Sequence, residues 1–129
     1  MRTLGQKRSE YALREILKII GEIKDKKGFA SFASSVPSMI LQNGFGQTLA
    51  FLYSKGSDKH LKILNITKKW LEQEGFIDKT NDVKEMILNI SNLSQGKYLA
   101  AQKETLSLLE WVKRYAQAFK EEKNNDSGS

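Results

Sequence analysis

Cysteine is absent from this chain of 129 residues, which excludes disulfide bonds and metal sites built from thiolates. The sequence has one histidine, His60, so no second histidine is available to share a metal ion. Because Lys59 and Lys62 lie beside His60, their positive charges disfavour its protonated form. We therefore expect His60 to be a partly exposed helix residue rather than a general base, and we expect no metal site.

Long hydrophobic runs and targeting signals are also missing. The stretch from residue 36 to residue 55 is apolar, but Pro37, Gly44 and Gly46 interrupt it. A membrane span needs about 20 predominantly apolar residues without such breaks. The first eight residues lack the apolar core of a signal peptide. These features predict a cytoplasmic protein that does not contact a membrane.

Residue patterns that assemble a catalytic centre are missing as well. The carboxylates are scattered, and none stands in a D-x-D or H-E-x-x-H arrangement that would position a metal or a water molecule. Gly44-Phe45-Gly46 resembles the start of a dinucleotide-binding loop, but Leu49 occupies the third glycine position and a predicted helix precedes the segment. We predict that the protein is not an enzyme and that it uses no cofactor and no small-molecule substrate.

Apolar residues recur at spacings of three and four along most of the chain, a pattern typical of amphipathic helices. No segment shows the sustained alternation of a β-strand. We predict an all-α protein, a compact single-domain bundle of about six helices over residues 1–120 with a long C-terminal helix. The polar segment 121–129 is expected to be a frayed or disordered tail. The expected helices span roughly residues 6–26, 29–42, 47–55, 58–73, 82–91 and 95–120.

Two of these helices have a clear apolar face. The face expected to be buried in the first helix contains Leu13, Ile16, Leu17, Ile20 and Ile23. The last helix has a heptad seam formed by Tyr98, Ala101, Thr105, Leu108, Val112, Tyr115 and Phe119. Such a seam either pairs with a second chain in a coiled coil or packs inside its own bundle, and we favour the bundle.

The interrupted apolar stretch, residues 36–55, is predicted to form two short buried helices that meet at a tight corner. Asn43 and Gly44 tolerate the left-handed conformation that ends a helix. Pro37 either kinks the first of these helices or lies in the first turn of a new one. We expect the corner to pack on the heptad seam.

The positive charge indicates the kind of partner. The formal net charge is +6 at pH 7 and the pI is about 9.5. An excess of this size favours polyanions such as nucleic acids, although a lysine-rich solubilising surface would produce it too.

The clearest basic constellation lies on the first predicted helix. Lys7, Tyr11, Arg14 and Lys18 are spaced so that they share one face, opposite the predicted core stripe, and Arg8 lies at its margin. Basic groups with an aromatic ring between them suit backbone phosphates and stacking on a base. The alternative is a solvated face with Tyr11 lying flat on its neighbours. We take these five as candidate RNA-binding residues.

The last helix contributes two further sets of candidates. Its basic residues outside the heptad seam, which we also take as candidate RNA-binding residues, are Lys103, Lys113 and Arg114. Leu99 and Leu106 are seven residues apart and lie away from the seam, so the helix is apolar on a second side. They are candidates for a protein interface.

Three segments carry a resemblance to a known family. Residues 37–45 (PSMILQNGF), then 49–52 (LAFL) and 54–55 (SK), resemble the P-x-M-I-x-x-N-G-[LF]…LAFL-x-SK stretch of the small helical subunit of the type III-B CRISPR effector, the Cmr complex. Residues 98–106 and 111–116 are similar to the closing helix of that family, and Arg8, Tyr11 and Ala12 fit its opening helix. The loop 75–81 and the residues from 121 onward lie outside the resemblance.

The resemblance implies both a fold and a function. Members of this family are compact all-α domains without nuclease activity. Several copies lie beside the repeated backbone subunits that hold the guide RNA, help to seat the target RNA and contact the large polymerase-like subunit. It transfers no catalytic residue to this chain. It implies an RNA-facing scaffold whose partners are those subunits, further copies of itself, guide RNA and target RNA.

Two alternatives remain open. A pure protein adaptor would bind acidic backbone subunits through Leu99, Leu106 and the basic faces. A free-standing helical regulator of nucleic acid would need a recognition helix, whereas apolar residues flank the corner at Asn43 and Gly44, so we favour it least. In the preferred interpretation the corner itself does not touch RNA.

Overall fold

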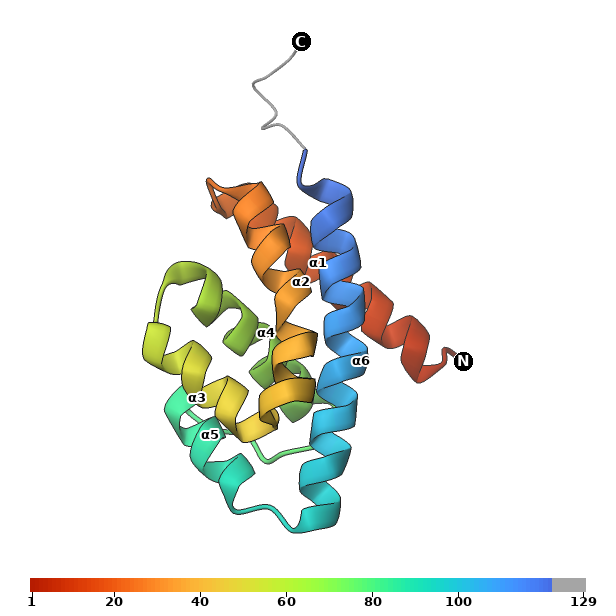
Figure 1. The fold of residues 1–129 in the computed structure, drawn as a ribbon. Coiled ribbons are helices and arrows are strands. Elements are labelled where there is room, and N and C mark those ends of the chain that lie inside the picture. Colours follow the sequence, from red (N-terminus) through yellow and green to blue (C-terminus); the bar gives the residue numbers. More distant parts are fainter. Residues whose placement is uncertain (122–129) are drawn as a thin grey trace.

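The computed structural model describes residues 1–121, and within this range it contains six α-helices and no β-strand. This confirms the all-α prediction. The long helix α6 runs beside α2, α1 crosses behind α6, and α3 and α5 lie on the other side of α2 (Figure 1). Helix α4 packs against α1 and α6 as well as against α2, α3 and α5. Apart from Glu121, the predicted tail lies outside the described residues. The helices are α1 (Leu4–Glu22), α2 (Lys26–Asn43), α3 (Phe45–Lys55), α4 (Asp58–Gln73), α5 (Val83–Ser91) and α6 (Gln95–Phe119).

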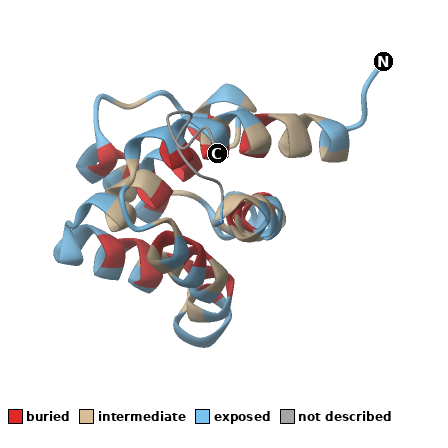
Figure 2. Ribbon diagram, turned by 90° about the horizontal axis from the view of Figure 1, so that it is seen from above, coloured by how far each residue is buried: buried red, intermediate tan, exposed pale blue. Residues whose placement is uncertain are grey.

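The heptad seam of α6 packs inside the bundle, as favoured from the sequence. Ala101, Thr105, Leu108 and Val112 are buried, and α6 lies against both α1 and α2. The outer members of the seam, Tyr98, Tyr115 and Phe119, are partly buried against the same core. The seam is therefore covered by helices of its own chain. Figure 2 shows the buried residues of the helices on the sides that face one another.

The boundary between α1 and α2 differs from the prediction, because Asp25 starts a new helix. Helix α1 ends at Glu22 rather than near Lys26, and α2 begins at Lys26 rather than at Phe29. The Asp25 carboxylate accepts a hydrogen bond from the Gly28 backbone N–H at 2.9 Å, which caps α2. A Cβ atom at Gly28 would lie 2.1 Å from Asp25 Oδ2, so any other residue there requires the Asp25 carboxylate to rotate from its present position.

The buried face of α1 is also rotated from its predicted position. Ile16 and Ile20 are buried as expected, but Leu17 is 46% exposed. Tyr11 and Ala12 are buried instead. The reason is that α1 contacts both α6 and α4, so a second neighbour covers a side of the helix that its periodicity assigned to solvent.

The corner between α2 and α3 forms where the sequence predicted it. Gly44 has φ +90°, in the region that glycine adopts without strain, and its N–H donates to the Ile40 carbonyl at 2.8 Å. Pro37 lies inside one continuous helix, α2, so it does not lie in the first turn of a new helix. The Gly46 N–H donates to the Tyr98 hydroxyl at 2.8 Å, which ties the corner to the start of α6. Within residues 1–121, no helix is long and apolar enough to cross a membrane.

Candidate nucleic-acid interface

A groove of about 340 Å³ lies between the N-terminal half of α1 and the C-terminal end of α4. We call it the α1 groove. It brings together three of the predicted residues, Lys7, Tyr11 and Arg14, whereas Lys18 and Arg8 are not among its lining residues. The residues that line it are Arg2, Lys7, Glu10, Tyr11, Arg14, Trp70 and Gln73.

Glu10 partly neutralises the cations of the α1 groove. Its carboxylate accepts hydrogen bonds from Arg2 and from Arg14 Nη2, the latter at 2.9 Å. These two guanidinium groups, Arg2 first, hold the pKa of Glu10 below its ordinary value. The side chain of Arg14 is 72% exposed, so this pair is solvated and its net contribution to stability is small. A phosphate group can therefore compete with Glu10 for Arg14.

Lys7 lies in the same groove and is paired with a carboxylate of α4. Its Nζ donates to Glu74 Oε1 at 2.9 Å, and the Glu74 side chain is only 11% exposed. The hydrogen bond from Lys7 lowers the pKa of Glu74, so the carboxylate is ionised at neutral pH. This ion pair joins the start of α1 to the end of α4 and reduces the charge that Lys7 presents to a ligand.

Tyr11 does not face solvent, contrary to the prediction from helical spacing. It is 8% exposed, and its hydroxyl donates to the Ile66 carbonyl at 2.7 Å. Its ring centroid lies 4.9 Å from that of Trp70, and Lys69 Nζ is 5.9 Å from its centroid. Burial raises the pKa of the Tyr11 phenol above its ordinary value. The ring is thus part of the packing between α1 and α4 and has no free face for a base.

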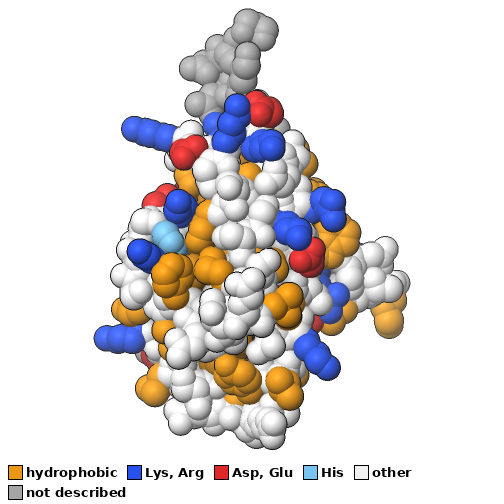
Figure 3. Space-filling view, in the orientation of Figure 1, with side chains coloured by type: hydrophobic (Ala, Val, Ile, Leu, Met, Phe, Trp, Pro, Cys, Tyr) orange, Lys and Arg blue, Asp and Glu red, His pale blue; other side chains and the backbone are white. Residues whose placement is uncertain are grey.

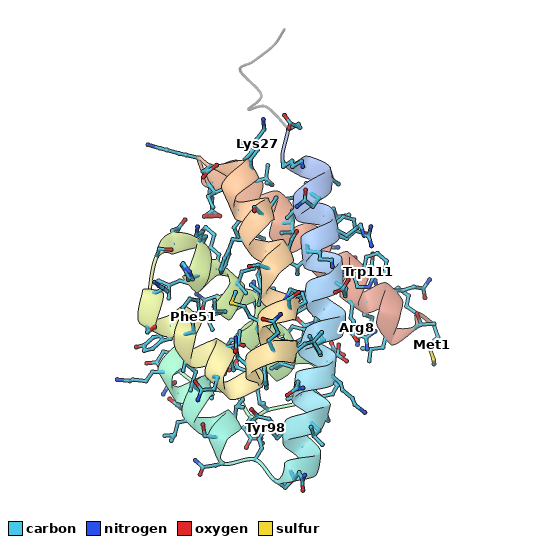
Figure 4. All side chains as sticks on the ribbon, in the orientation of Figure 1. Met1, Arg8, Lys27, Phe51, Tyr98 and Trp111 are labelled. Carbon is cyan, nitrogen blue, oxygen red and sulfur yellow. The ribbon has the colours of Figure 1, made fainter. Side chains whose placement is uncertain are left out.

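Arg8 also differs from its predicted role, because its guanidinium group is paired with a buried carboxylate. Its Nε and Nη2 atoms donate to the two oxygens of Glu104 on α6, at 2.5 and 2.9 Å, and Trp70 Nε1 donates to the same carboxylate at 2.8 Å. Glu104 is 5% exposed, and the hydrogen bond to it raises the pKa of Arg8. Figure 4 labels Arg8 where α1 passes α6. The Arg8 side chain is 20% exposed, but a phosphate that bound it would leave the buried Glu104 carboxylate without its cation, which disfavours Arg8 as a surface phosphate ligand.

Lys18 remains on the surface, outside the α1 groove. Its Nζ lies 3.4 Å from the Glu15 carboxylate, which also accepts from Lys69 at 2.8 Å. The side chain of Lys18 is 64% exposed. The predicted line of four residues is therefore divided: Lys7 and Arg14 share a groove, Tyr11 is buried between helices, and Lys18 lies apart.

The outer surface of α6 carries the second predicted basic set. Lys103 and Arg114 are exposed, and neither forms an ion pair within the described part of the chain. They are eleven residues apart, which places them within about 20° of each other around the helix. Lys113 Nζ pairs with Glu110 Oε1 at 3.1 Å. We call the surface formed by Leu99, Lys103, Trp111 and Arg114 the α6 outer surface.

Aromatic and apolar side chains accompany these cations. Trp111 is 37% exposed and stacks on Tyr115, with ring centroids 5.8 Å apart and planes inclined by 24°. Figure 4 labels Trp111 on α6. Sequence reasoning missed Trp111, although its spacing of four from Tyr115 was visible. Leu99 is 44% exposed, but Leu106 is partly buried against the core. The predicted protein-interface pair is therefore exposed only at Leu99.

In residues 1–121, no group of three or more His, Asp or Glu side chains could hold a metal ion. His60 is partly exposed, as predicted, and its Nδ1 is hydrogen-bonded to the Ser57 hydroxyl. Desolvation, followed by the charges of Lys59 and Lys55, lowers the pKa of His60. Among the groove residues, Arg2, Glu10, Trp70 and Gln73 were not predicted. Trp70 and Gln73 belong to α4, and only the contact of α1 with α4 brings them there.

These observations define a class of protein, an all-α bundle that presents cationic surfaces on its first and last helices. The particular family follows from comparison with known proteins. The model of a family described as CRISPR-associated protein (Cas_Cmr5) matches residues 4–119, and the chain belongs to this family.

Two further comparisons agree with this assignment. The CRISPR system Cmr subunit Cmr5 of Thermus thermophilus is 31% identical over 94 residues, which are 73% of this chain and 76% of that protein. The X-ray crystal structure of a CRISPR-associated Cmr5 family protein from Thermus thermophilus is similar, with a TM-score of 0.75 and 26% identity. The match covers 92% of this chain and 97% of that chain. The resemblance to the small subunit of the Cmr complex is thereby confirmed.

Proposed function

We propose that this chain is a non-catalytic small subunit of a type III-B CRISPR effector, the Cmr complex. It scaffolds the complex and helps to seat target RNA along the guide RNA. Its partners are the repeated backbone subunit, the large polymerase-like subunit, further copies of itself, and the two RNAs. The observation that carries this proposal is the family match over residues 4–119, which spans all six helices.

The α6 outer surface is the first candidate for the RNA contact. Lys103 and Arg114 have no carboxylate partner among the described residues, so a phosphate can bind them without displacing an ion pair. Trp111 lies on the same helix with an exposed fraction that allows contact with a base or a sugar. The α1 groove is the second candidate, because Arg14 and Arg2 share one solvated carboxylate.

Charge reversal distinguishes the two surfaces. The complex is assembled with Lys103→Glu/Arg114→Glu, with Arg14→Glu, or with Lys84→Glu as a control at an exposed lysine of α5 that belongs to neither surface. Target-RNA affinity is then measured against salt concentration. Loss of each phosphate contact is expected to reduce the slope of log K against log salt by about 0.7 to 0.9. Unchanged affinity and slope for the first two variants would show that neither surface binds RNA.

One observation favours a second candidate function, a pure protein adaptor. Leu99 is 44% exposed beside Lys103, and an apolar side chain next to a cation suits an acidic protein surface better than a phosphate backbone. In that case Leu99→Ser and Lys103→Glu would reduce recovery of the other subunits, while RNA binding by the complexes that do assemble would stay unchanged.

A further inference from the structure

A second groove lies in the inner angle of the corner between α2 and α3. It has a volume of about 260 Å³ and is lined by Met39, Asn43, Gln47, Thr48 and Phe51. We call it the corner groove. It is separate from the α1 groove and from the α6 outer surface, and it shares no lining residue with either. Its volume suits a single large side chain.

An aromatic cluster extends the corner groove toward α4. Phe51, which is 43% exposed, has its ring centroid 6.3 Å from that of His60, and Phe32 lies 4.6 Å from His60 on the other side. Figure 3 shows hydrophobic side chains gathered beside the histidine on the face over α2 and α3. Together with Met39, these rings form an apolar surface of a kind that marks interaction sites when it is contiguous and edged by polar groups.

Two lysines edge this surface with positive charge. Lys55 Nζ lies 5.5 Å from the ring centroid of Phe51, and Lys59 Nζ lies 5.4 Å from that of Phe32. Neither lysine forms an ion pair with a carboxylate in residues 1–121. The surface therefore combines an apolar centre with a cationic rim, which is complementary to an apolar side chain flanked by carboxylates.

The polar groups of the groove suit a polypeptide. Asn43 and Gln47 contribute side-chain amides, which donate to and accept from a peptide backbone. The Thr48 hydroxyl is buried without a hydrogen-bond partner in the described structure. Met39 adds a flexible thioether that adapts to the shape of an inserted side chain.

The chemistry of the rim separates three possible occupants. A second copy of this chain would bring two cationic rims together, and the net charge of +6 opposes that contact. A nucleic-acid base needs a free ring face, but Phe32 already has His60 and Lys59 close to its ring, and Phe51 has Lys55. An acidic protein segment needs only the groove, the exposed part of Phe51 and the two ammonium groups.

We propose that the corner groove binds an acidic segment of a neighbouring protein subunit. The segment places one apolar side chain between Met39 and Phe51 and sets its carboxylates against Lys55 and Lys59. This inference rests on the proposed function, because it needs an assembled complex. It assigns a protein contact to the corner, the segment by which the family is recognised, and leaves RNA to the other two surfaces.

Photo-crosslinking in the assembled complex tests the proposal. The photoreactive residue p-benzoylphenylalanine replaces Phe51 in one variant and Tyr53 in a matched control. Both positions are on α3 and are 43% exposed, but they are about 200° apart around the helix. After irradiation, mass spectrometry identifies the attached molecule. The proposal expects the probe at position 51 to label an acidic segment of another Cmr subunit, and the probe at position 53 not to label it.

Charge variants complete the test. Lys55→Glu/Lys59→Glu is expected to lower the crosslink yield by roughly fivefold or more, since two rim charges are reversed. Lys79→Glu/Lys84→Glu, which changes two exposed lysines elsewhere, should leave it unchanged. If the charge reversal lowers the thermal stability of the chain, Lys55→Gln/Lys59→Gln replaces it, and this variant is expected to give an intermediate crosslink yield.

The remaining outcomes each count against a stated proposal. Labelling of RNA, of a second copy of this chain or of nothing in an intact complex overturns this inference alone. Charge variants that leave the yield at position 51 unchanged overturn it as well. A wild-type chain that recovers neither Cmr subunits nor RNA contradicts the proposed function itself, and this inference fails with it.

Discussion

The guanidinium group of Arg8 on α1 binds both carboxylate oxygens of Glu104 on α6, at 2.5 and 2.9 Å. Trp70 of α4 donates a third hydrogen bond to the same carboxylate, at 2.8 Å. Residues separated by 34 and 96 positions in the chain therefore meet at one buried charge. This contact joins α1, α4 and α6, and Trp70 also lines the α1 groove.

Removal of one partner of this pair is expected to be strongly destabilising. Arg8→Met leaves the Glu104 carboxylate buried with only the indole donor of Trp70, which should lower the free energy of unfolding by about 3–5 kcal/mol. Urea denaturation measures the change. Arg8→Met/Glu104→Gln, which keeps an acceptor for Trp70 but no charge, should recover part of the loss. A loss below about 1 kcal/mol for Arg8→Met would show that the pair contributes no more than a solvent-exposed ion pair does.

Tyr11 should contribute to stability and not to RNA binding. Tyr11→Phe removes the hydrogen bond to the Ile66 carbonyl and is expected to cost about 1 kcal/mol, with target-RNA affinity unchanged. Its raised pKa adds a pH dependence. The unfolded chain releases the phenolic proton near the ordinary pKa of 10.0 while the folded chain retains it, so stability falls as the pH rises above that value.

The comparison that tests this dependence is between the wild type and Tyr11→Phe in thermal unfolding at pH 8 and above pH 10. The difference in stability between the two should shrink at the higher pH. If Tyr11→Phe weakens RNA binding while the chain remains fully folded, the result would support the RNA contact that helical spacing predicted for Tyr11.

Glu74 makes the free energy of unfolding depend on pH in the acidic range, and it forms an ion pair with Lys7. Because Lys7 depresses the pKa of Glu74, the stabilisation is fully present above the ordinary pKa of 4.5 and is lost as the pH falls through the lower folded-state value. Glu74→Gln should make unfolding less sensitive to acid in that range. It also frees Lys7, so the salt slope for RNA binding should increase by about 0.7 if the α1 groove contacts RNA. An unchanged slope would assign the RNA contact elsewhere.

Gly28 and Gly96 lie in the first turns of α2 and α6, so alanine substitutions at these two positions can be compared. Gly28→Ala would place a Cβ atom 2.1 Å from Asp25 Oδ2, so the carboxylate must rotate and the cap of α2 is weakened. This loss, up to about 1 kcal/mol, is expected to offset the gain in helix propensity from alanine. Gly96→Ala, in the first turn of α6, meets nothing within 4 Å and should be neutral or stabilising by up to about 1 kcal/mol. Equal melting temperatures for the two variants would contradict the role assigned to Gly28.

Much of the fold could be predicted from local pattern. The spacing of Ala101, Thr105, Leu108 and Val112 predicted the buried seam of α6, because a helix repeats every 3.6 residues whatever surrounds it. Gly44 predicted the corner, because a positive φ at that point favours glycine. The boundary at residues 23–25 was missed, because the apolar period of α1 continues to Ile23 while the cap at Asp25 starts α2.

The candidate site could be predicted less well. A helical wheel assigns one buried face, but α1 is covered by α6 on one side and by α4 on another. Tyr11 is therefore buried and Arg8 is only 20% exposed, although the wheel places them toward solvent. The partner of Arg8 is 96 residues away, and no periodicity in either segment indicates that contact. Lys103 and Arg114 remained exposed, because they lie on the side of α6 away from the seam.

By itself, the sequence determined the helical class, the seam of α6, the corner at Gly44 and the family, because each depends on spacing or on residue types along a continuous segment. Only the tertiary structure decided which cations remain available to a partner. Ion pairing and burial depend on where distant helices meet. That arrangement pairs Arg8 with the buried Glu104, pairs Lys7 with Glu74, and leaves Lys103 and Arg114 exposed without carboxylate partners among the described residues.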